Sequence, residues 1–201
     1  MGETSKVGIS ASKVVALIAT LILIRDSISY FYTTDALAII FGIVGLVLAF
    51  VVWVSLDIID MRKLVIPYYW WVLLIIGLFL ILVEYLVGPN YLGGILMITA
   101  ALIEFLSQKK PYPASRIVAL IGACYAIYEA ISTMLFGGNI GAAIVALIFA
   151  IILILTMTNI DIKVPYTWWV VLIIGFVIFT WAYTVSGTVI MVAFILILMA
   201  Y

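Results

Sequence analysis

The stretch PYYWWVLLIIG occupies Pro67–Gly77, and PYTWWVVLIIG occupies Pro165–Gly175, so nearly the same eleven residues occur twice in one chain. A second recurrence precedes each of them. ASKVVALI spans Ala11–Ile18, and ASRIVALI spans Ala114–Ile121. Because the two matching pairs occur in the same order, we predict that the chain consists of two copies of one structural unit.

The composition indicates a lipid environment. Of the 201 residues, 69% are hydrophobic and only 9% are charged, whereas a soluble domain is about half apolar and about a quarter charged. A protein of this size cannot bury so much apolar surface in its core, so we expect its exterior to be in contact with the lipid bilayer. Nine basic residues balance nine acidic ones, which leaves no basic patch and argues against nucleic acid as a partner.

Two features of the composition restrict the chemistry. Histidine does not occur, which excludes His-ligated haem, the common His metal sites and Ser-His or Cys-His catalytic pairs. Cys124 is the single cysteine, so no disulfide can form within the chain. We therefore expect no metal, no cofactor and no enzymatic activity. The scarcity of Asn and Gln favours a thermophilic source.

Apolar segments separated by turn-forming residues predict an all-α integral membrane protein, because helices satisfy every backbone hydrogen bond inside lipid. We expect eight transmembrane helices, of which the fourth and the eighth are the shortest. They cover residues 12–32, 35–56, 66–87, 91–107, 114–135, 139–158, 165–185 and 187–201. The last connector is expected at Ser186-Gly187. Pro67 and Pro165 are expected in the first turn of their helices, where proline costs least.

The basic residues predict how the helices are oriented. Eight of the nine precede the first helix, lie at the start of a helix or lie in the connectors on one side, and the connectors on the other side contain none. By the positive-inside rule, both the N- and the C-terminus of this cell-membrane protein are therefore predicted to lie in the cytoplasm. The eight residues are Lys6, Lys13, Arg62, Lys63, Lys109, Lys110, Arg116 and Lys163.

The duplication divides the chain into a first four-helix repeat over residues 1–110 and a second four-helix repeat over residues 111–201, integrated in one membrane bundle. An even number of helices returns the chain to the side from which it started. The two tandem repeats are therefore predicted to have the same, parallel orientation, with both termini cytoplasmic.

The aromatic residues of the repeated stretch predict an aromatic belt at the water–lipid boundary, because amphipathic rings prefer that depth. A ligand cage of aromatic rings is the alternative, and we favour the belt. The belt residues are Tyr68, Trp70, Trp71, Tyr166, Trp168 and Trp169.

A candidate polar cluster lies in the outer third of the predicted spans. It consists of Arg25, Asp26, Glu84 and Glu129, and Asp26 and Glu129 occupy equivalent positions in the two repeats. Charges inside lipid are costly and are functional candidates by default. Arg25 is the only cation near three acids, so we expect at least one carboxyl to remain protonated. Either the cluster is a cation or proton site open to the outside, or Arg25 pairs with one acid as a polar latch.

Short loops and few polar residues in the spans favour a non-catalytic membrane protein, a structural or accessory subunit of a larger membrane complex. Its expected partners are other membrane proteins or further copies of itself. The alternative is a small ion, proton or solute transporter or channel, which the duplication and the matched Asp26 and Glu129 favour. A lipid-modifying enzyme would need polar residues clustered at one leaflet, and the connectors are too short to supply them.

Overall fold

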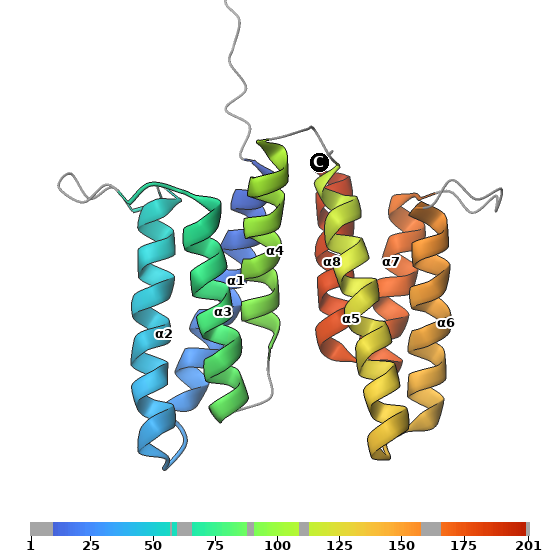
Figure 1. The fold of residues 1–201 in the computed structure, drawn as a ribbon, viewed down its shortest axis with the longest axis horizontal. Helices are drawn as coiled ribbons and strands as arrows, with labels where there is room; N and C mark the ends of the chain where they lie inside the picture. Colours follow the sequence, from blue (N-terminus) through green and yellow to red (C-terminus); the bar gives the residue numbers. More distant parts are fainter. Residues whose placement is uncertain are drawn as a thin grey trace, which may run out of the picture. The chain divides into compact units, whose positions relative to one another are not determined.

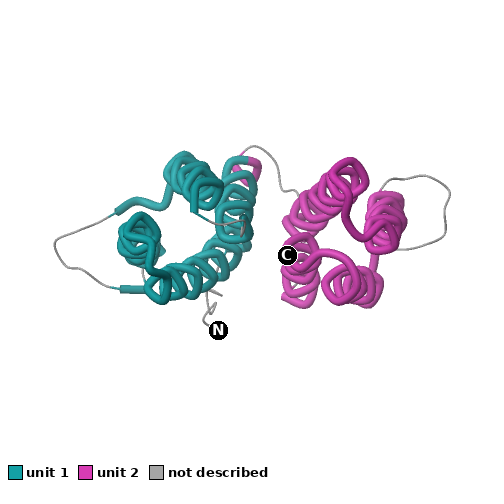
Figure 2. The backbone as a smooth tube through the Cα atoms, turned by 90° about the horizontal axis from the view of Figure 1, so that it is seen from below, with its two compact units in different colours: residues 1–105 teal, residues 106–201 magenta. Residues whose placement is uncertain are grey.

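A computed structural model of the chain contains eight α-helices and one short π-helix, and no strand among the residues that it describes. Those residues are 10–56, 58–59, 66–87, 91–108, 113–157 and 166–199. The chain divides into two compact units, unit 1 over residues 1–105 and unit 2 over residues 106–201. The helices of each unit are grouped around that unit's own centre (Figure 2). The predicted all-α class is confirmed for the described residues.

Successive helices run up and down in each unit (Figure 1). Unit 1 contains α1 (Ala11–Tyr30), α2 (Ala36–Ser55), α3 (Trp70–Val87) and α4 (Leu92–Ser107), whose last turn crosses the boundary between the units. Unit 2 contains α5 (Ala114–Phe136), α6 (Ile140–Met157), α7 (Trp168–Val177), the π-helix η1 (Ile178–Ala182) and α8 (Thr184–Leu198).

Local signals in the sequence explain where several helices begin and end. Ser10 Oγ accepts a hydrogen bond from the Lys13 N–H at 3.3 Å, and Asp35 Oδ1 accepts one from the Leu37 N–H at 3.0 Å. Both side chains therefore cap the first turn of a helix. Gly137 caps the C-terminal end of α5 with a φ of +79°, a left-handed conformation that favours glycine.

The hydrogen bonds of Ser12 fix the direction of three helices in unit 1. Ser12, near the start of α1, donates to the Ala100 carbonyl in the second half of α4 at 3.1 Å. The same hydroxyl lies 2.6 Å from the Tyr68 hydroxyl, just before α3. α1 and α3 therefore run in the same direction and α4 runs in the opposite direction. It follows that the C-terminal ends of α1 and α3 lie at the same end of unit 1.

Small residues allow close helix packing in both units. A Cβ at Gly45 of α2 would collide with Ser27 Oγ of α1, and a Cβ at Gly77 of α3 would lie 2.9 Å from the Ile98 backbone nitrogen of α4. In unit 2, a Cβ at Gly122 would lie 2.7 Å from a side-chain carbon of α8. Ala130, Ala143 and Ala146 form a fully buried cluster between α5 and α6. At such contacts the small residues let the helix backbones approach closely, whereas large side chains would hold them apart.

The turn between α7 and α8 corrects the sequence-based prediction, which placed it at Ser186-Gly187. η1 continues α7, and Tyr183 alone separates η1 from α8, with an extended φ of −134°. The Tyr183 N–H donates to the Ile178 carbonyl at 2.8 Å. Ser186 and Gly187 therefore lie at the start of α8. A Cβ at Gly187 would collide with the Phe179 backbone, so the absence of a side chain there permits helix packing and does not break a helix.

The start of α3 also differs from the prediction. Pro67 lies three residues before the helix, and not in its first turn. The Tyr69 carbonyl is the acceptor for the Val72 N–H at 3.1 Å, so Tyr69 is the residue at which the helical hydrogen bonds start. Pro165, for which the same was predicted, lies outside the described residues.

Four helices, α2, α3, α5 and α6, are long and apolar enough to cross a membrane. α4, α8 and α7 with η1 are shorter apolar helices. α1 has 20 residues but contains Lys13, Arg25 and Asp26. The structure therefore supports a helical membrane protein.

Large apolar side chains are exposed at helical spacing along the candidate spans, as expected of a face in contact with lipid. They include Ile40, Ile43 and Val47 on α2, Ile75, Leu78 and Leu82 on α3, and Ile144, Ile148 and Ile151 on α6.

Candidate functional site

The structure brings two of the predicted acids, Asp26 and Glu84, into one pocket of unit 1. Asp26 lies near the C-terminal end of α1 and Glu84 near the C-terminal end of α3, so the parallel course of these helices places both carboxyls at the same end of the unit. They are close enough for their charges to interact. Both side chains are buried, with 8% of Asp26 and 5% of Glu84 exposed.

The pocket is small and mainly apolar, with four polar side chains. Its volume is about 10 Å³, which is about the space that one water molecule requires. The lining residues are Leu23, Asp26, Ser27, Tyr30, Phe41, Gly45, Phe79, Leu80, Val83 and Glu84.

Two of the pocket's polar atoms lack a hydrogen-bond partner among the described residues. They are Ser27 Oγ and Glu84 Oε2, and Ser27 is 1% exposed. Glu84 Oε1 lies on the side of α4, 3.7 Å from where a Cβ at Gly93 would be. A buried polar group without a partner costs free energy. The pocket therefore offers hydrogen-bonding or ligating capacity that the protein itself does not use.

Arg25 lies apart from this pocket. Its side chain is exposed, whereas the neighbouring Asp26 is buried. It is not among the residues that line the pocket. The structure thus places two acids together and leaves the cation of the predicted cluster at the surface of α1.

The fourth member of the predicted cluster, Glu129, lies on α5 of unit 2 and is half-buried. Its carboxyl interacts with Ser186, in the first turn of α8, while its buried Oε2 atom has no hydrogen-bond partner among the described residues. A carboxylate at this position also interacts favourably with the N-terminal end of the helix dipole. Tyr183 donates to Thr133 Oγ1 at 2.6 Å, and Thr133 donates to the Glu129 backbone carbonyl at 2.8 Å. Glu129 is therefore held by contacts between α5 and α8.

Unit 2 carries one acid where unit 1 carries two. The two PY-WW stretches are 98 residues apart, and Ala182 lies 98 residues after Glu84. The position equivalent to Glu84 in unit 2 therefore holds an alanine. That alanine packs against the buried cluster of α5 and α6. The two units are therefore chemically different at this end.

Polar contacts at the opposite end of each unit follow a matching pattern. Lys13 Nζ lies 5.7 Å from the centre of the Tyr68 ring, and the Arg116 guanidinium lies 5.5 Å from the centre of the Tyr166 ring. Contacts of this geometry are attractive cation–π interactions. Both tyrosines precede the helical part of their segments. Burial raises the pKa of Tyr68, and burial raises the pKa of Tyr166 to about 12 against the smaller effects of Ser115 and Arg116.

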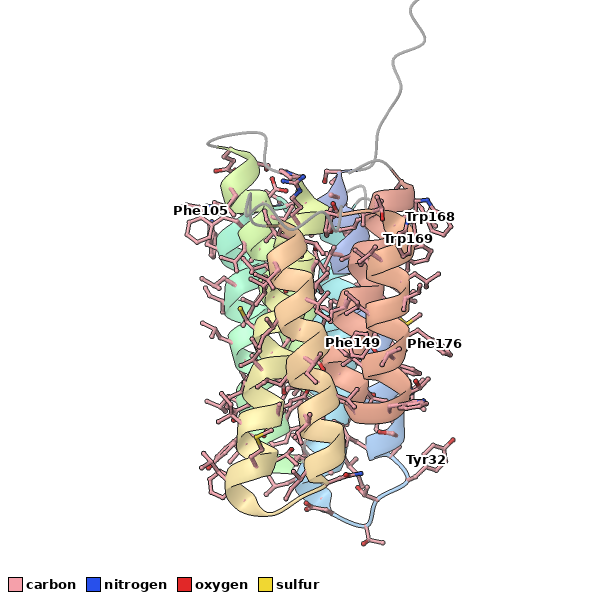
Figure 3. The ribbon with its side chains drawn as sticks, turned by 90° about the vertical axis from the view of Figure 1, so that its right-hand side faces the viewer. Tyr32, Phe105, Phe149, Trp168, Trp169 and Phe176 are labelled. Carbon is pink, nitrogen blue, oxygen red and sulfur yellow. The ribbon has the colours of Figure 1, made fainter. Side chains whose placement is uncertain are left out.

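The predicted belt residues have two different orientations. Trp71, Trp168 and Trp169 are each about half exposed, and Figure 3 shows Trp168 and Trp169 projecting outward at one end of α7. Trp70 instead contacts the Phe105 ring of α4, with 4.9 Å between ring centres. Tyr68 and Tyr166 are turned toward α1 and α5, as described above. Three tryptophans thus face outward, and the location of a water–lipid boundary remains a prediction.

Several residues of these polar networks were not predicted from the sequence. Ser27 follows Asp26 directly, yet a single serine in an apolar helix carries no distinctive signal. Thr20 accepts a hydrogen bond from Trp53 Nε1 at 3.0 Å and joins α1 to α2. Ser12 had a signal, because its serine recurs in both copies of the ASxxVALI stretch.

No group of three His, Cys, Asp or Glu side chains able to hold a metal ion occurs within the described part of the chain. No protein-family model, curated protein or solved structure shows a significant match to the chain. The functional argument therefore depends on the geometry of the residues alone.

Proposed function

We propose that the chain is an eight-span membrane protein of two four-helix repeats in parallel orientation, with both termini in the cytoplasm. Matched internal contacts support the duplication. A Cβ at Gly94 would approach Ile81, and a Cβ at Gly187 would approach Phe179. Phe179 follows Ile81 by 98 residues, the interval between the PY-WW stretches, and Gly187 follows Gly94 by 93. The cytoplasmic placement of the termini is supported by the distribution of basic residues.

We infer that this protein is non-catalytic and serves as a structural or accessory component of a larger membrane complex. One observation carries the inference: among the described residues, where a polar side chain hydrogen-bonds outside its own helix, its partner lies in the same unit. Ser12 joins α1 to α4, Thr20 joins α1 to α2, and Tyr183 joins the turn before α8 to α5. Large apolar side chains face outward. Such an exterior can contact lipid, another membrane protein or a second copy of the chain.

Isolation from native membranes tests this role. The tagged full chain is expected to copurify with reproducible, stoichiometric membrane-protein partners in mild detergent, or to form a defined homo-oligomer. The measurement is mass spectrometry of the purified particle together with its size in detergent. A stable monomeric particle of 22.2 kDa without partners would contradict the accessory role.

The carboxyl pocket supports a second candidate function, the transport of a proton or a small cation. Ionisable residues inside membrane spans commonly lie on proton and ion pathways. Asp26 and Glu84 share a pocket that also holds unpartnered polar atoms. Under this function the pocket is the outer-third carboxylate site of a small transporter or channel.

Flux in liposomes tests transport separately from complex formation. Purified protein should move a proton or Na⁺ across the membrane, and the double substitution Asp26→Asn with Glu84→Gln should abolish the flux. Glu129→Gln measures the contribution of unit 2 on its own. Unchanged flux in the double variant would remove the pocket from the mechanism, and no flux in the unmodified protein would refute transport.

A further inference from the structure

The pocket between α1, α2 and α3 combines two carboxyl groups, a small cavity and two polar atoms without a hydrogen-bond partner among the described residues. Asp26 and Glu84 supply carboxyl groups, and Ser27 and Tyr30 supply hydroxyl-bearing side chains. The buried Ser27 Oγ and Glu84 Oε2 atoms have no partner among the described residues. Gly45 contributes no side chain beside Ser27. The site is therefore built from side chains on two helices and is kept open by a glycine on a third.

We propose that this pocket binds one dehydrated sodium ion, ligated by Asp26, Glu84 and Ser27. Two buried carboxyls that line one small pocket repel each other when both are ionised, and a cation between them removes that repulsion. Oxygen is the preferred donor for hard cations. The ion supplies the missing partner of the serine hydroxyl and of the second glutamate oxygen.

The size and the ligand number of the pocket restrict the ion. A volume of about 10 Å³ accommodates one water-sized particle, so no hydrated ion fits. Mg²⁺ usually retains several waters. Ca²⁺ takes about six to eight oxygen ligands. The pocket offers fewer, because Glu84 directs Oε1 toward Gly93 and leaves only Oε2 for an ion. A small monovalent cation therefore matches the pocket best.

This inference deepens the transport function proposed above and names its ion, but binding itself does not require transport. A sodium ion that stays bound would stabilise unit 1 by joining α1 to α3. Binding and flux are therefore measured separately, so that the two proposals can fail separately.

Thermal unfolding of the purified full chain in detergent tests the binding. The six tryptophans report unfolding by intrinsic fluorescence, at pH 8, in NaCl, KCl or choline chloride of equal concentration. We expect a saturable rise in Tm of at least about 2 °C in NaCl alone, since a ligand that binds only the folded state stabilises it. Scintillation proximity with ²²Na⁺ should give about one ion for each chain.

Matched variants locate the ion. Asp26→Asn and Glu84→Gln should each lose the sodium-dependent rise in Tm, whereas Glu129→Gln in unit 2 should keep it. If either of the first two variants fails to fold, Ser27→Ala replaces it and should weaken ²²Na⁺ binding at least about tenfold, because it removes one ligand.

Three results would overturn the proposal. They are equal Tm values in NaCl and KCl, a response to CaCl₂ without one to NaCl, and retention of ²²Na⁺ binding by folded Asp26→Asn and Glu84→Gln. Sodium binding without flux in liposomes would support the proposal and refute transport. Flux without sodium binding would refute the proposal and leave proton transport standing.

Discussion

The Tyr68 hydroxyl, just before α3, belongs to a hydrogen-bond network that joins three helical segments of unit 1. It lies 2.6 Å from Ser12 Oγ, and Ser12 in turn donates to the carbonyl of Ala100. The Ser12 hydroxyl of α1 thus contacts both the segment that precedes α3 and the backbone of α4. In an environment poor in water, polar groups of this kind have few other partners. The contact therefore contributes to stability as well as to the direction of the helices.

Tyr68→Phe should lower the stability of the folded protein. It removes one partly buried hydrogen bond, and a hydrogen bond contributes about 0.5–1.5 kcal/mol. For a chain of this size about 1 kcal/mol corresponds to a Tm change of about 2–4 °C. Thermal unfolding in detergent measures the change. Tyr69→Phe is the matched control, because Tyr69 is 48% exposed. Equal Tm values for the two variants would show that the Ser12 contact does not stabilise the protein.

Tyr166 predicts a loss of stability at alkaline pH. Burial raises its pKa to about 12, above the value of about 10 for an exposed tyrosine. The folded state therefore favours the neutral phenol, so this contribution is fully present below about pH 10 and is lost as the pH rises toward 12. Tyr166→Phe should lose less stability than the unmodified protein between about pH 10 and pH 12. Parallel pH profiles of Tm for the two proteins would contradict this expectation.

At the residue scale, the sequence predicted one cluster of four charged residues, and the pocket of unit 1 holds only Asp26 and Glu84 of these four. Asp26 and Glu84 were recognisable because charges are rare in apolar segments. Arg25 was expected near them because it lies at the same depth of the predicted spans, yet the neighbouring residues Arg25 and Asp26 point in directions about 100° apart on the helix. Ser27 gave no signal, since its importance depends on Gly45 of another helix. Such contacts between helices cannot be inferred from one sequence.

At the scale of elements, close backbone contacts between helices replace large interlocking side chains. η1 and α8 provide the clearest case, because a Cβ at Gly187 would collide with the backbone of Phe179. The π-helix and the single turn residue Tyr183 let the chain reverse direction within a short distance. π-helical turns often occur where a helix is adapted to a particular contact. The geometry of this hairpin therefore depends on glycine.

Gly187→Ala should destabilise unit 2. The added methyl group would push α8 away from η1, and overpacking of this kind costs about 1–3 kcal/mol. Gly141→Ala on α6 is the matched control, because its Cβ would meet only the exposed Asn139 side chain at 3.3 Å and alanine favours a helix. Thermal unfolding should show a lower Tm for Gly187→Ala and an unchanged or higher Tm for Gly141→Ala. The reverse order would refute the packing argument.

The sequence predicted the elements well where a local signal exists. Asp35 and Gly137 mark the end of one helix or the start of the next, and the structure places helix ends there. The turn before α8 was misplaced, because Ser186-Gly187 is typical of a connector in sequence while its glycine serves a contact with η1. Pro67 was misplaced for a similar reason, since a proline before a helix and a proline in its first turn have the same sequence pattern.

At the scale of the whole molecule, the proposed topology depends on an even number of helices in each unit. Four helices return the chain to the side from which unit 1 starts, so unit 2 starts on that side too. The basic residues agree, since the cations at the start of the two units, Lys13 and Arg116, occupy equivalent positions. Each contacts the ring of the tyrosine that precedes the third helix of its own unit.

Cysteine accessibility in intact cells tests this topology. The exposed native Cys124 is first replaced by Ala, and single cysteines are then introduced by Ser10→Cys, Pro113→Cys, Tyr32→Cys and Asn139→Cys. Ser10 and Pro113 precede α1 and α5, so a membrane-impermeant maleimide should label these variants only after the membrane is permeabilised. Tyr32 and Asn139 follow α1 and α5 and should be labelled from outside. Labelling of Ser10→Cys and Pro113→Cys from opposite sides would instead require an odd number of crossings in unit 1, and the parallel arrangement of the repeats would be wrong.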